Sequence, residues 1–549
     1  MDNNFNWSHG YKINTKYTKS VAYYSMEFAI DQALKIYSGG LGYLAGSHMK
    51  SAYALKQNMI GIGMLWKKGY YDQIRDEHGL MKVAHQNRMY SFLEDTGITV
   101  TVLVKGFEVK VKALYLAPEI FQTVPMFFLT TDLPENDYLA RSITEQLYHP
   151  NDEARIAQNI VLGIGGSKVI DVLGGVDIYH MNEAHSLPIA CFLFDKFDGH
   201  LDEVKKRLVF TTHTPEKAGN AVRDIQLLFD MGFFHKMNFE TARNVTQTYS
   251  DQFEYTPAAL RMAKRANGVS ALHGEVAREM WKSYKGICPI ISITNAQNQA
   301  YWQDATLLQY LQAGDDQQLI QRKKYLKRQL FKIVADQTGK LFDENVLTIV
   351  WARRFAAYKR ADLITKDIER FTRLISGDQA VQIIWSGKPY PEDHGAVTVF
   401  NALVRMSKDY NNVAVLTGYE LEQSAALKKG ADIWLNNPRR PQEASGTSGM
   451  TAAMNGAINL STNDGWIPEF ANNGINSFII READLNQSII HQDKEDHLQL
   501  MQLLESTIVP MYYTQASNWL KVMKQSMLDV TPQFDSDRMA GEYYEKMFL

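Results

Sequence analysis

Residues 346–360 read VLTIVWARRFAAYKR and decide the fold, because a buried strand and a cluster of cations meet there. VLTIVW (346–351) is a short, continuous apolar run of the kind that forms a buried strand. Three similar runs follow, each after a segment long enough for a helix: VQIIWS (381–386), NVAVLT (412–417) and ADIWLN (431–436). Strands that alternate with helices predict a parallel sheet, and continuous apolar runs predict helices on both of its faces.

The first half of the chain shows the same pattern more weakly. VDIYHM (176–181) and RLVFTT (207–212) are the expected strands there. A charged stretch near 305–340 separates the halves, and we interpret its basic run as a solvated helix face rather than an interaction patch. We therefore predict an α/β fold of two doubly wound domains around a cleft. The predicted ranges are 1–310, 311–510 and a helical tail, 511–549, that packs back on the N-terminal domain.

Composition excludes several classes of protein. The 549 residues carry 58 Lys and Arg against 61 Asp and Glu, and 45% are apolar, so the chain is neither disordered nor an evident nucleic-acid or membrane-surface binder. Two cysteines exclude a disulfide scaffold. A polar start and the lack of a membrane-length apolar run lead us to expect a cytoplasmic protein.

Two segments that follow strands in the second half are candidates for binding an anion. Four cations come within the eight residues that follow VLTIVWA: Arg353, Arg354, Lys359 and Arg360. Such side chains bind phosphate through their charge and, for arginine, through two parallel N–H donors. PRRPQEASGTSGMTAAMNGA follows ADIWLN, with a predicted helix at about 448–457. A helix N-terminus suits phosphate, although Ser445 and Thr447 are equally read as plain helix caps.

Three segments of the first half are weaker candidates. Ser38–Gly42 is glycine-rich, so its backbone could approach a ligand, or it is an ordinary tight turn. His185 (after Asn182 and Glu183) and His213 each follow a predicted strand. A histidine in such a place is a site residue or a satisfied structural residue.

At these residues the chain resembles the α-glucan phosphorylases, in the short bacterial form. The resemblance runs from about Val21 to Trp466 through ten ordered segments: AYYSMEFA, YSGGLGYLAG, YHMNEAH, TTHTPEKAGN, ANGVSALHGEVAREMW, ITNAQNQAYW, WARRFAAYKRADL, WSGKPYPEDHG, WLNNPRRPQEASGTSGM and NGAINLSTNDGW. It implies a GT-B fold with two Rossmann-like domains facing across a cleft. It also implies retaining glucosyl transfer between phosphate and an α-1,4-glucan, with glucose 1-phosphate as product. The expected cofactor is pyridoxal phosphate, no metal is expected, and the expected assembly is a homodimer.

The resemblance also implies roles for individual residues. The catalytic set is His213, Arg354, Lys359 and Glu443. The cofactor set is Gly39, Gly40, Arg353, Tyr419, Thr447 and position 451. The substrate set is Leu41, His185, Asn295, Ser445 and Gly446. In such a site, fixed cations would hold phosphate dianions beside a cation-like glucosyl group.

Position 451 departs from the family pattern. In the family, the lysine that tethers the cofactor directly follows Gly-Met, whereas this chain reads Gly449-Met450-Thr451. Threonine has no amine, and the nearest preceding lysines, Lys428 and Lys429, lie on another predicted helix without support from a motif. Three readings stay open: phosphorolysis with a cofactor held noncovalently, a cofactor-free transferase that uses a sugar nucleotide, and a glucan-binding relative without catalysis.

Overall fold

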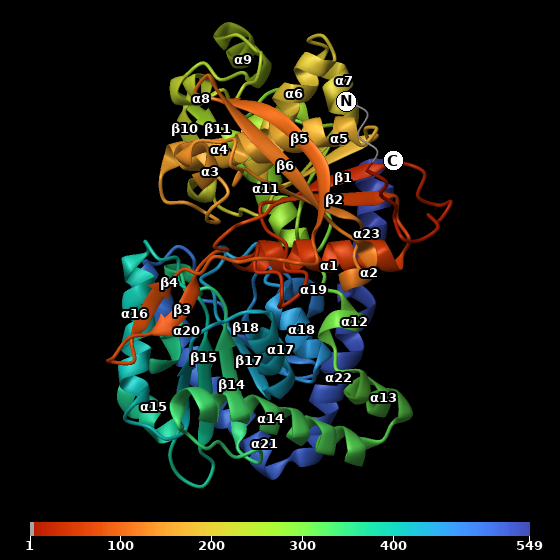
Figure 1. Ribbon diagram of the computed structural model, residues 1–549. Helices are drawn as coiled ribbons and strands as arrows, with labels where there is room; N and C mark the ends of the chain where they lie inside the picture. The colour runs from red at the N-terminus through yellow and green to blue at the C-terminus, as the bar shows by residue number, and fades with distance from the viewer. Residues whose placement is uncertain (1–4) are drawn as a thin grey trace. The chain divides into compact units, whose positions relative to one another are not determined.

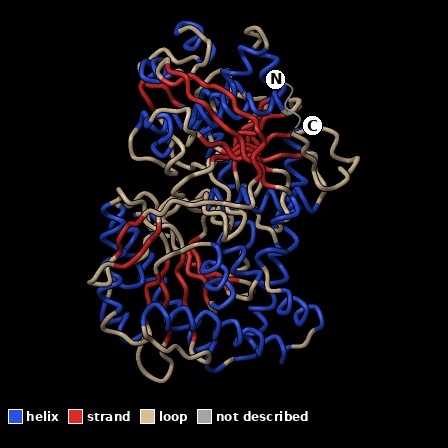
Figure 2. The backbone as a smooth tube through the Cα atoms, viewed as in Figure 1, coloured by secondary structure: helices blue, strands red, loops and turns tan. Residues whose placement is uncertain are grey.

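The computed structural model describes residues 5–549, which divide into two compact α/β units. Unit 1 holds the described residues up to Tyr71, His85–Asn295 and Ser536–Leu549, and unit 2 holds Asp72–Ala84 and Ala296–Asp535. Figures 1 and 2 show the strands of each unit gathered into a sheet with helices around it. Within the described part of the chain, no helix combines the length and the apolar character that crossing a bilayer requires.

The sheet of unit 2 has six strands, and all neighbours pair in parallel. Their spatial order is β16 (Val413–Leu416), β15 (Val381–Ser386), β14 (Leu347–Ala352), β17 (Ile433–Asn436), β18 (Ile458–Thr462) and β19 (Ser477–Ile480). Counted along the chain, this is the doubly wound order 3-2-1-4-5-6, which reverses between β14 and β17. The four strands predicted in this half are confirmed.

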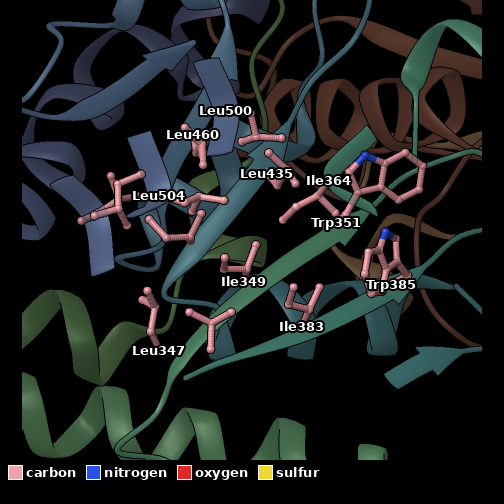
Figure 3. Packing of buried hydrophobic residues seen from close by; sticks show 14 of the residues in the cluster. Leu347, Ile349, Trp351, Ile364, Ile383, Trp385, Leu435, Leu460, Leu500 and Leu504 are labelled. Atoms are coloured by element: carbon pink, nitrogen blue, oxygen red, sulfur yellow. The ribbon is translucent and has the colours of Figure 1, made fainter. Parts of the chain in front are cut away.

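Helices cover both faces of this sheet. Leu330 of α14 (Asp316–Thr338), Leu427 of α17 (Leu421–Gly430) and Ala452 of α18 (Ser448–Met454) pack with Val350 on one face. Ile349 and Trp351 point to the other face, where Leu435, Leu460, Leu500 and Leu504 surround them (Figure 3). The longer helices of unit 2 are α13 (Ala305–Ala313), α14 (Asp316–Thr338), α16 (His394–Ser407), α17 (Leu421–Gly430), α20 (Ile489–Leu503) and α22 (Ala516–Phe534), and α18 is Ser448–Met454.

Unit 1 has a nine-stranded sheet that also reverses its order. The strands are β13 (Ile290–Ser292), β12 (Arg265–Gly268), β9 (Leu208–Thr211), β8 (Ile178–Asn182), β1 (Val21–Tyr24), β2 (Met59–Met64), β7 (Met126–Thr130), β6 (Phe107–Leu116) and β5 (Glu94–Val104). The first seven pair in parallel, whereas β6 is antiparallel to both of its neighbours, β7 and β5. The switch lies between β1 and β8, and the predicted strands at 176–181 and 207–212 are confirmed as β8 and β9.

The longer helices of unit 1 include both the glycine-rich segment and part of the tail. They are α1 (Gly40–Ala54), α4 (Asp152–Ile160), α6 (Pro188–Lys196), α9 (Phe239–Thr246), α10 (Tyr255–Met262), α11 (Ala271–Trp281) and α23 (Ser536–Tyr543). Helix α1 packs against α23. The glycine-rich segment does not directly follow a strand, because thirteen residues of irregular chain separate β1 from Ser38.

The division of the chain departs from the predicted ranges. The boundary falls between Asn295 and Ala296 rather than at 310, because α13 and α14 pack on the core of unit 2. Of the tail, only Ser536–Leu549 belongs to unit 1. A hairpin of β3 (Asp72–Arg75) and β4 (Met81–Ala84) joins unit 2, where Gln73 Nε2 donates to the Gly387 carbonyl at 3.1 Å.

Two local expectations were wrong. The basic run of α14 is not only a solvated face, because Lys323 and Lys327 are buried. Lys327 Nζ bonds Asp432 Oδ2 at 2.5 Å, so a carboxylate compensates its charge. The helix expected at about 448–457 ends at Met454, because Asn455 caps it and Gly456 turns the chain at φ +72°.

Candidate active site

The candidate residues of unit 2 follow the two strands at which the sheet order reverses. Arg353 directly follows β14, and the loop from Asn437 to Thr447 follows β17. In open parallel sheets, ligands bind outside the carboxyl ends of the strands at this switch point. The topology therefore brings together the two segments that the sequence marked for anion binding.

Arg353, Lys359 and Glu443 form a buried ion cluster at this point. Glu443 Oε2 lies 3.0 Å from Arg353 Nη2 and 2.7 Å from Lys359 Nζ. Burial alone would raise the pKa of Glu443, but Lys359 and Arg353 outweigh it and lower that pKa to about 2. One carboxylate thus faces two cations, and the cluster keeps a net positive charge.

Arg353 has donors that this carboxylate does not use. Its Nε and Nη1 are buried and have no hydrogen-bond partner among residues 5–549. A guanidinium does not lose its proton in proteins, and a buried donor without an acceptor is costly. An oxyanion such as phosphate would satisfy both donors with bidentate geometry.

The other two cations of this segment have different surroundings. Arg354 is exposed, and its charge contributes to the low pKa of Glu443. Arg360 is buried and bonds Asp496, Asp493 and the carbonyls of Asn437 and Pro438. Arg360 therefore ties the loop after β17 to α20 and is not available to an anion.

A second carboxylate fixes the loop that carries Glu443. Asp464 accepts from the Glu443 amide through Oδ2 at 2.9 Å, and the Trp466 amide donates to the Ser445 carbonyl at 3.0 Å. Ser445 Oγ is buried without a partner among the described residues, and Gly446 turns the loop at φ +89°. Burial, with Glu443 beside it, raises the pKa of Asp464 to about 7.

The remaining unit 2 candidates lie just before α17, just before α18 and on α18. Tyr419 is buried before α17, and its hydroxyl accepts a hydrogen bond from Ser424 Oγ at 3.0 Å. Thr447 is half-buried at the start of α18. Thr451 is fully buried one turn later, and its Oγ1 donates to the Ser448 carbonyl at 3.0 Å.

In unit 1, the glycine-rich segment already binds a carboxylate of the chain. Glu27 accepts from the amides of Ser38 and Gly39 at 2.6 and 3.0 Å, and from Tyr148 Oη at 2.7 Å. A carboxylate of the chain therefore occupies these two amides. Gly39 and Gly40 still border open space, where a Cβ would meet no atom within 4 Å, and Leu41 follows in the first turn of α1.

The two histidines gather beside Glu183 at the carboxyl end of β8. His213 Nε2 lies 2.7 Å from Asn182 Oδ1, and the His213 amide donates to Glu183 Oε1 at 2.5 Å. Burial lowers the pKa of His213 to about 3 and that of His185 to about 4, so both imidazoles are neutral near pH 7. His185 Nδ1 and Asn295 Oδ1 are buried without a hydrogen-bond partner among residues 5–549, which suits polar ligand groups.

Sequence reasoning missed Glu27 and Asp464, the two carboxylates that fix the loops around these candidates. Both lie in segments of the resemblance, Glu27 in AYYSMEFA and Asp464 in NGAINLSTNDGW. Their spacing in the sequence does not mark them as site residues, because each accepts a hydrogen bond from a loop eleven or more residues away. Among the described residues, no group of three or more His, Cys, Asp and Glu side chains could hold a metal ion.

Comparisons with known proteins agree with these segments. The profile of the carbohydrate phosphorylases matches residues 245–480. An uncharacterized protein of Methanocaldococcus jannaschii is 45% identical over 96% of this chain and 100% of its own length. The maltodextrin phosphorylase of Thermococcus litoralis is 32% identical over 97% of this chain and 71% of its own. The glycogen phosphorylase of Mycobacterium tuberculosis is 30% identical over 96% and 70%. The chain therefore belongs to the carbohydrate phosphorylase family.

Proposed function

We propose that the protein transfers glucosyl units between an α-1,4-glucan and inorganic phosphate, with retention, to give α-glucose 1-phosphate. The observation that carries this proposal is the buried pair of unused donors on Arg353 beside Lys359. Relatives named maltodextrin phosphorylase and glycogen phosphorylase support the substrate class.

Each part of the unit 2 cluster has a role in this proposal. Arg353 and Lys359 bind the dianion, Glu443 holds both cations in place, and Asp464 holds the Glu443 loop. Because these groups are fixed and buried, they stabilise charge in the transition state without rearranging. Arg354 adds positive charge at the exposed edge.

The sugar contacts come from neutral groups. Ser445 Oγ, Asn295 Oδ1 and His185 Nδ1 each have hydrogen-bonding capacity that the chain does not use. His213, neutral and tied to Asn182, keeps Nδ1 for a sugar hydroxyl. We propose the GT-B fold for this chain, because each of its two units has an α/β sheet of the doubly wound kind.

The residues fit the cofactor of the family only in part. Arg353, Lys359 and Thr447 would hold the phosphate of pyridoxal phosphate beside the substrate phosphate, with one unused donor of Arg353 for each phosphate. Thr451 does not fit a tether at position 451, because a buried hydroxyl cannot form an imine. When bound, the cofactor would supply a phosphate that exchanges a proton with the substrate phosphate. The missing amine favours, as second candidate, a cofactor-free transferase that uses a sugar nucleotide.

One set of assays separates these functions. The protein is incubated with maltodextrin and phosphate, with and without pyridoxal phosphate, and glucose 1-phosphate is measured. We expect phosphate-dependent release that pyridoxal phosphate increases. Glucosyl transfer from UDP- or ADP-glucose without such release would favour the second candidate. Binding of maltodextrin without either turnover would contradict both and indicate a binding protein.

A further inference from the structure

Glu183 has a backbone conformation that residues with a side chain rarely adopt. It directly follows β8, and its backbone has a φ of +68° and a ψ of 166°. This combination belongs to a region of backbone space that is almost exclusive to glycine. Such strain persists only where the surrounding structure imposes it, and it concentrates at functional sites. A glycine here would remove the strain, so a glutamate in its place indicates a use for the side chain.

Gln122, Gln247 and Arg360 also have a positive φ, but their conformation is milder. Their ψ values of 55°, 41° and 54° place them in the left-handed helical region, where each follows the last residue of a helix or helical turn. Residues other than glycine that have a positive φ are found mostly in that region. Glu183 lies outside it, so the ordinary explanation of a positive φ at a helix end does not apply.

The side chain of Glu183 joins the ends of two neighbouring strands. Its Oε1 accepts from the His213 amide at 2.5 Å and from Thr214 Oγ1 at 3.2 Å, in the loop after β9. Its Oε2 accepts from the Ala184 amide at 3.2 Å. The main-chain amide of Glu183 donates to the Thr211 carbonyl at 2.9 Å, so β8 and β9 stay paired up to this point. One carboxylate thus fixes the loop that begins after β9.

His213 is held by two consecutive residues. Asn182 Oδ1 lies 2.7 Å from its ring Nε2, and Glu183 Oε1 accepts from its main-chain amide. In a regular strand, consecutive side chains point to opposite faces of the sheet. The positive φ of Glu183 interrupts this alternation at the end of β8, so both side chains contact the same residue. The strained backbone therefore allows the main chain and the ring of His213 to be fixed together.

Capping of the short helix that follows does not account for Glu183. The helix η2 (Ala184–Ser186) has three residues, and only Oε2 of Glu183 contacts its first amide. Asn, Asp, Ser and Thr are the usual capping residues, and Asn and Asp also tolerate a positive φ best. The shorter contact, at 2.5 Å, joins Oε1 to the His213 amide. The carboxylate is thus directed mainly at the loop after β9.

We propose that Glu183 is a positioning residue for His213, and that its strained backbone serves to hold the main chain and the ring of His213 in one orientation. This inference rests on the proposed function, in which His213 contacts the glucosyl unit. Glu183 acts through His213 and not on the substrate itself. Its removal should therefore impair the use of maltodextrin and leave the affinity for phosphate unchanged, because the residues proposed to bind phosphate belong to unit 2.

Steady-state kinetics tests the positioning role. Glu183→Ala removes the carboxylate, and its matched control is Glu135→Ala, which removes an exposed glutamate of the same unit. In Glu183→Ala, kcat/KM for maltodextrin at saturating phosphate should fall at least tenfold, while KM for phosphate stays within twofold. The control should match the parent protein in both quantities. An unchanged kcat/KM for maltodextrin, or an equal rise of both KM values, would overturn the inference.

Glu183→Gly separates the positioning role from a loss of folding. It loses the same carboxylate but relieves the strain, so its urea midpoint should exceed that of Glu183→Ala. This is the reverse of the usual order, in which glycine is less stable than alanine. Its kcat/KM for maltodextrin should be as low as that of Glu183→Ala. A glycine variant with the kcat/KM of the parent would overturn the positioning role, and a midpoint no higher than that of Glu183→Ala would overturn the strain.

Hydrogen exchange followed by mass spectrometry tests the same contact without activity. The peptide that carries His213 should exchange faster in both Glu183 variants than in the parent or Glu135→Ala, because the His213 amide loses its acceptor. If the parent releases no glucose 1-phosphate, the proposed function fails, and the exchange still decides whether Glu183 holds this loop. If the parent is active and exchange at His213 is unchanged in the variants, only the inference about Glu183 fails.

Discussion

Arg353 combines a partner inside the chain with donors that have none among the described residues, and this combination makes it the most informative single residue. Nη2 bonds Glu443, whereas Nε and Nη1 are buried and unused. Hydrogen bonds to charged groups contribute roughly 1.5–3 kcal/mol each. If both donors bind phosphate, Arg353→Met should lower kcat/KM for phosphate by about 100-fold or more.

The control for this prediction is Arg370→Met. Arg370 also bonds a carboxylate, Glu505, but it is a half-buried residue of α15 (Ile368–Leu374) and is not one of the candidate site residues. Its loss should leave phosphorolysis unchanged. Steady-state kinetics at varied phosphate concentration gives the comparison. Equal kcat/KM in Arg353→Met and the parent protein would exclude Arg353 from phosphate binding.

Asp464 and Glu443 are neighbouring carboxyl groups with opposite pKa shifts, and this difference predicts a pH dependence of stability. The pKa of Asp464 is about 7 in the folded chain, above the 3.8 of an ordinary aspartate. The folded state therefore binds this proton more tightly. The resulting stabilisation is complete below about pH 4 and is lost as the pH rises to about 7.

Asp464→Asn removes this titration. The unfolding free energy of the parent protein minus that of Asp464→Asn should fall between pH 4 and pH 7, by up to roughly 4 kcal/mol at 1.36 kcal/mol per pKa unit. Above pH 7 the difference should level off. Urea denaturation at a series of pH values measures it. A difference that stays constant over this range would show that Asp464 ionises normally in the folded state.

At the scale of elements, α14 is held to its sheet by charge as well as by apolar contacts. Lys327 Nζ bonds Asp432 Oδ2 at the start of β17, and the Thr348 amide donates to the same carboxylate oxygen. Lys327→Met leaves that carboxylate buried without its cation, which costs about 3–5 kcal/mol. Lys332→Met, an exposed position on the same helix, should change the unfolding free energy by less than about 0.5 kcal/mol. Urea denaturation distinguishes these values, and similar losses in both variants would contradict the prediction.

Apolar runs predicted the strands well, but they could not predict which charged residues are buried. The continuous runs at 346–351 and 381–386 became β14 and β15 nearly residue for residue, because a strand covered on both faces must be apolar throughout. Lys327 looked like a surface residue, since its partner Asp432 lies 105 positions away. The burial of Glu27 was equally unpredictable, because its carboxylate accepts hydrogen bonds from amides of the glycine-rich segment, eleven and twelve positions away.

At the scale of the whole molecule, the sequence did not reveal that the chain passes between the units more than once. Helix propensity predicts a helical tail, but it does not show that the tail is divided between the two units. Its last part, Ser536–Leu549, lies in unit 1, where Ser536 Oγ lies 2.6 Å from Ser51 Oγ and Ala540 accepts from Gln57 at 3.0 Å. These partners are nearly 490 positions apart, and no local pattern records such contacts.

The returning segment is predicted to stabilise unit 1 selectively. Tyr543 is buried, and its hydroxyl accepts at 2.9 Å from Nδ2 of Asn267, a residue of β12. Removing a large buried aromatic side chain costs about 3–5 kcal/mol. Tyr543→Ala should therefore open unit 1, while the sheet of unit 2 keeps its protection. Tyr249→Ala is the matched control, because Tyr249 belongs to the same unit and is 68% exposed.

Hydrogen exchange followed by mass spectrometry resolves the two units. Peptides from β8, β9 and β12 should lose protection in Tyr543→Ala and keep it in Tyr249→Ala, while peptides from β14, β15 and β17 should be unchanged in both. The expectation follows from the contacts, since the side chain of Tyr543 bonds residues of unit 1: Thr211 and Asn267. Equal loss of protection in both sheets would mean that the chain unfolds as one cooperative body. In that case, the crossings of the chain between the units would couple the two cores into a single unfolding transition.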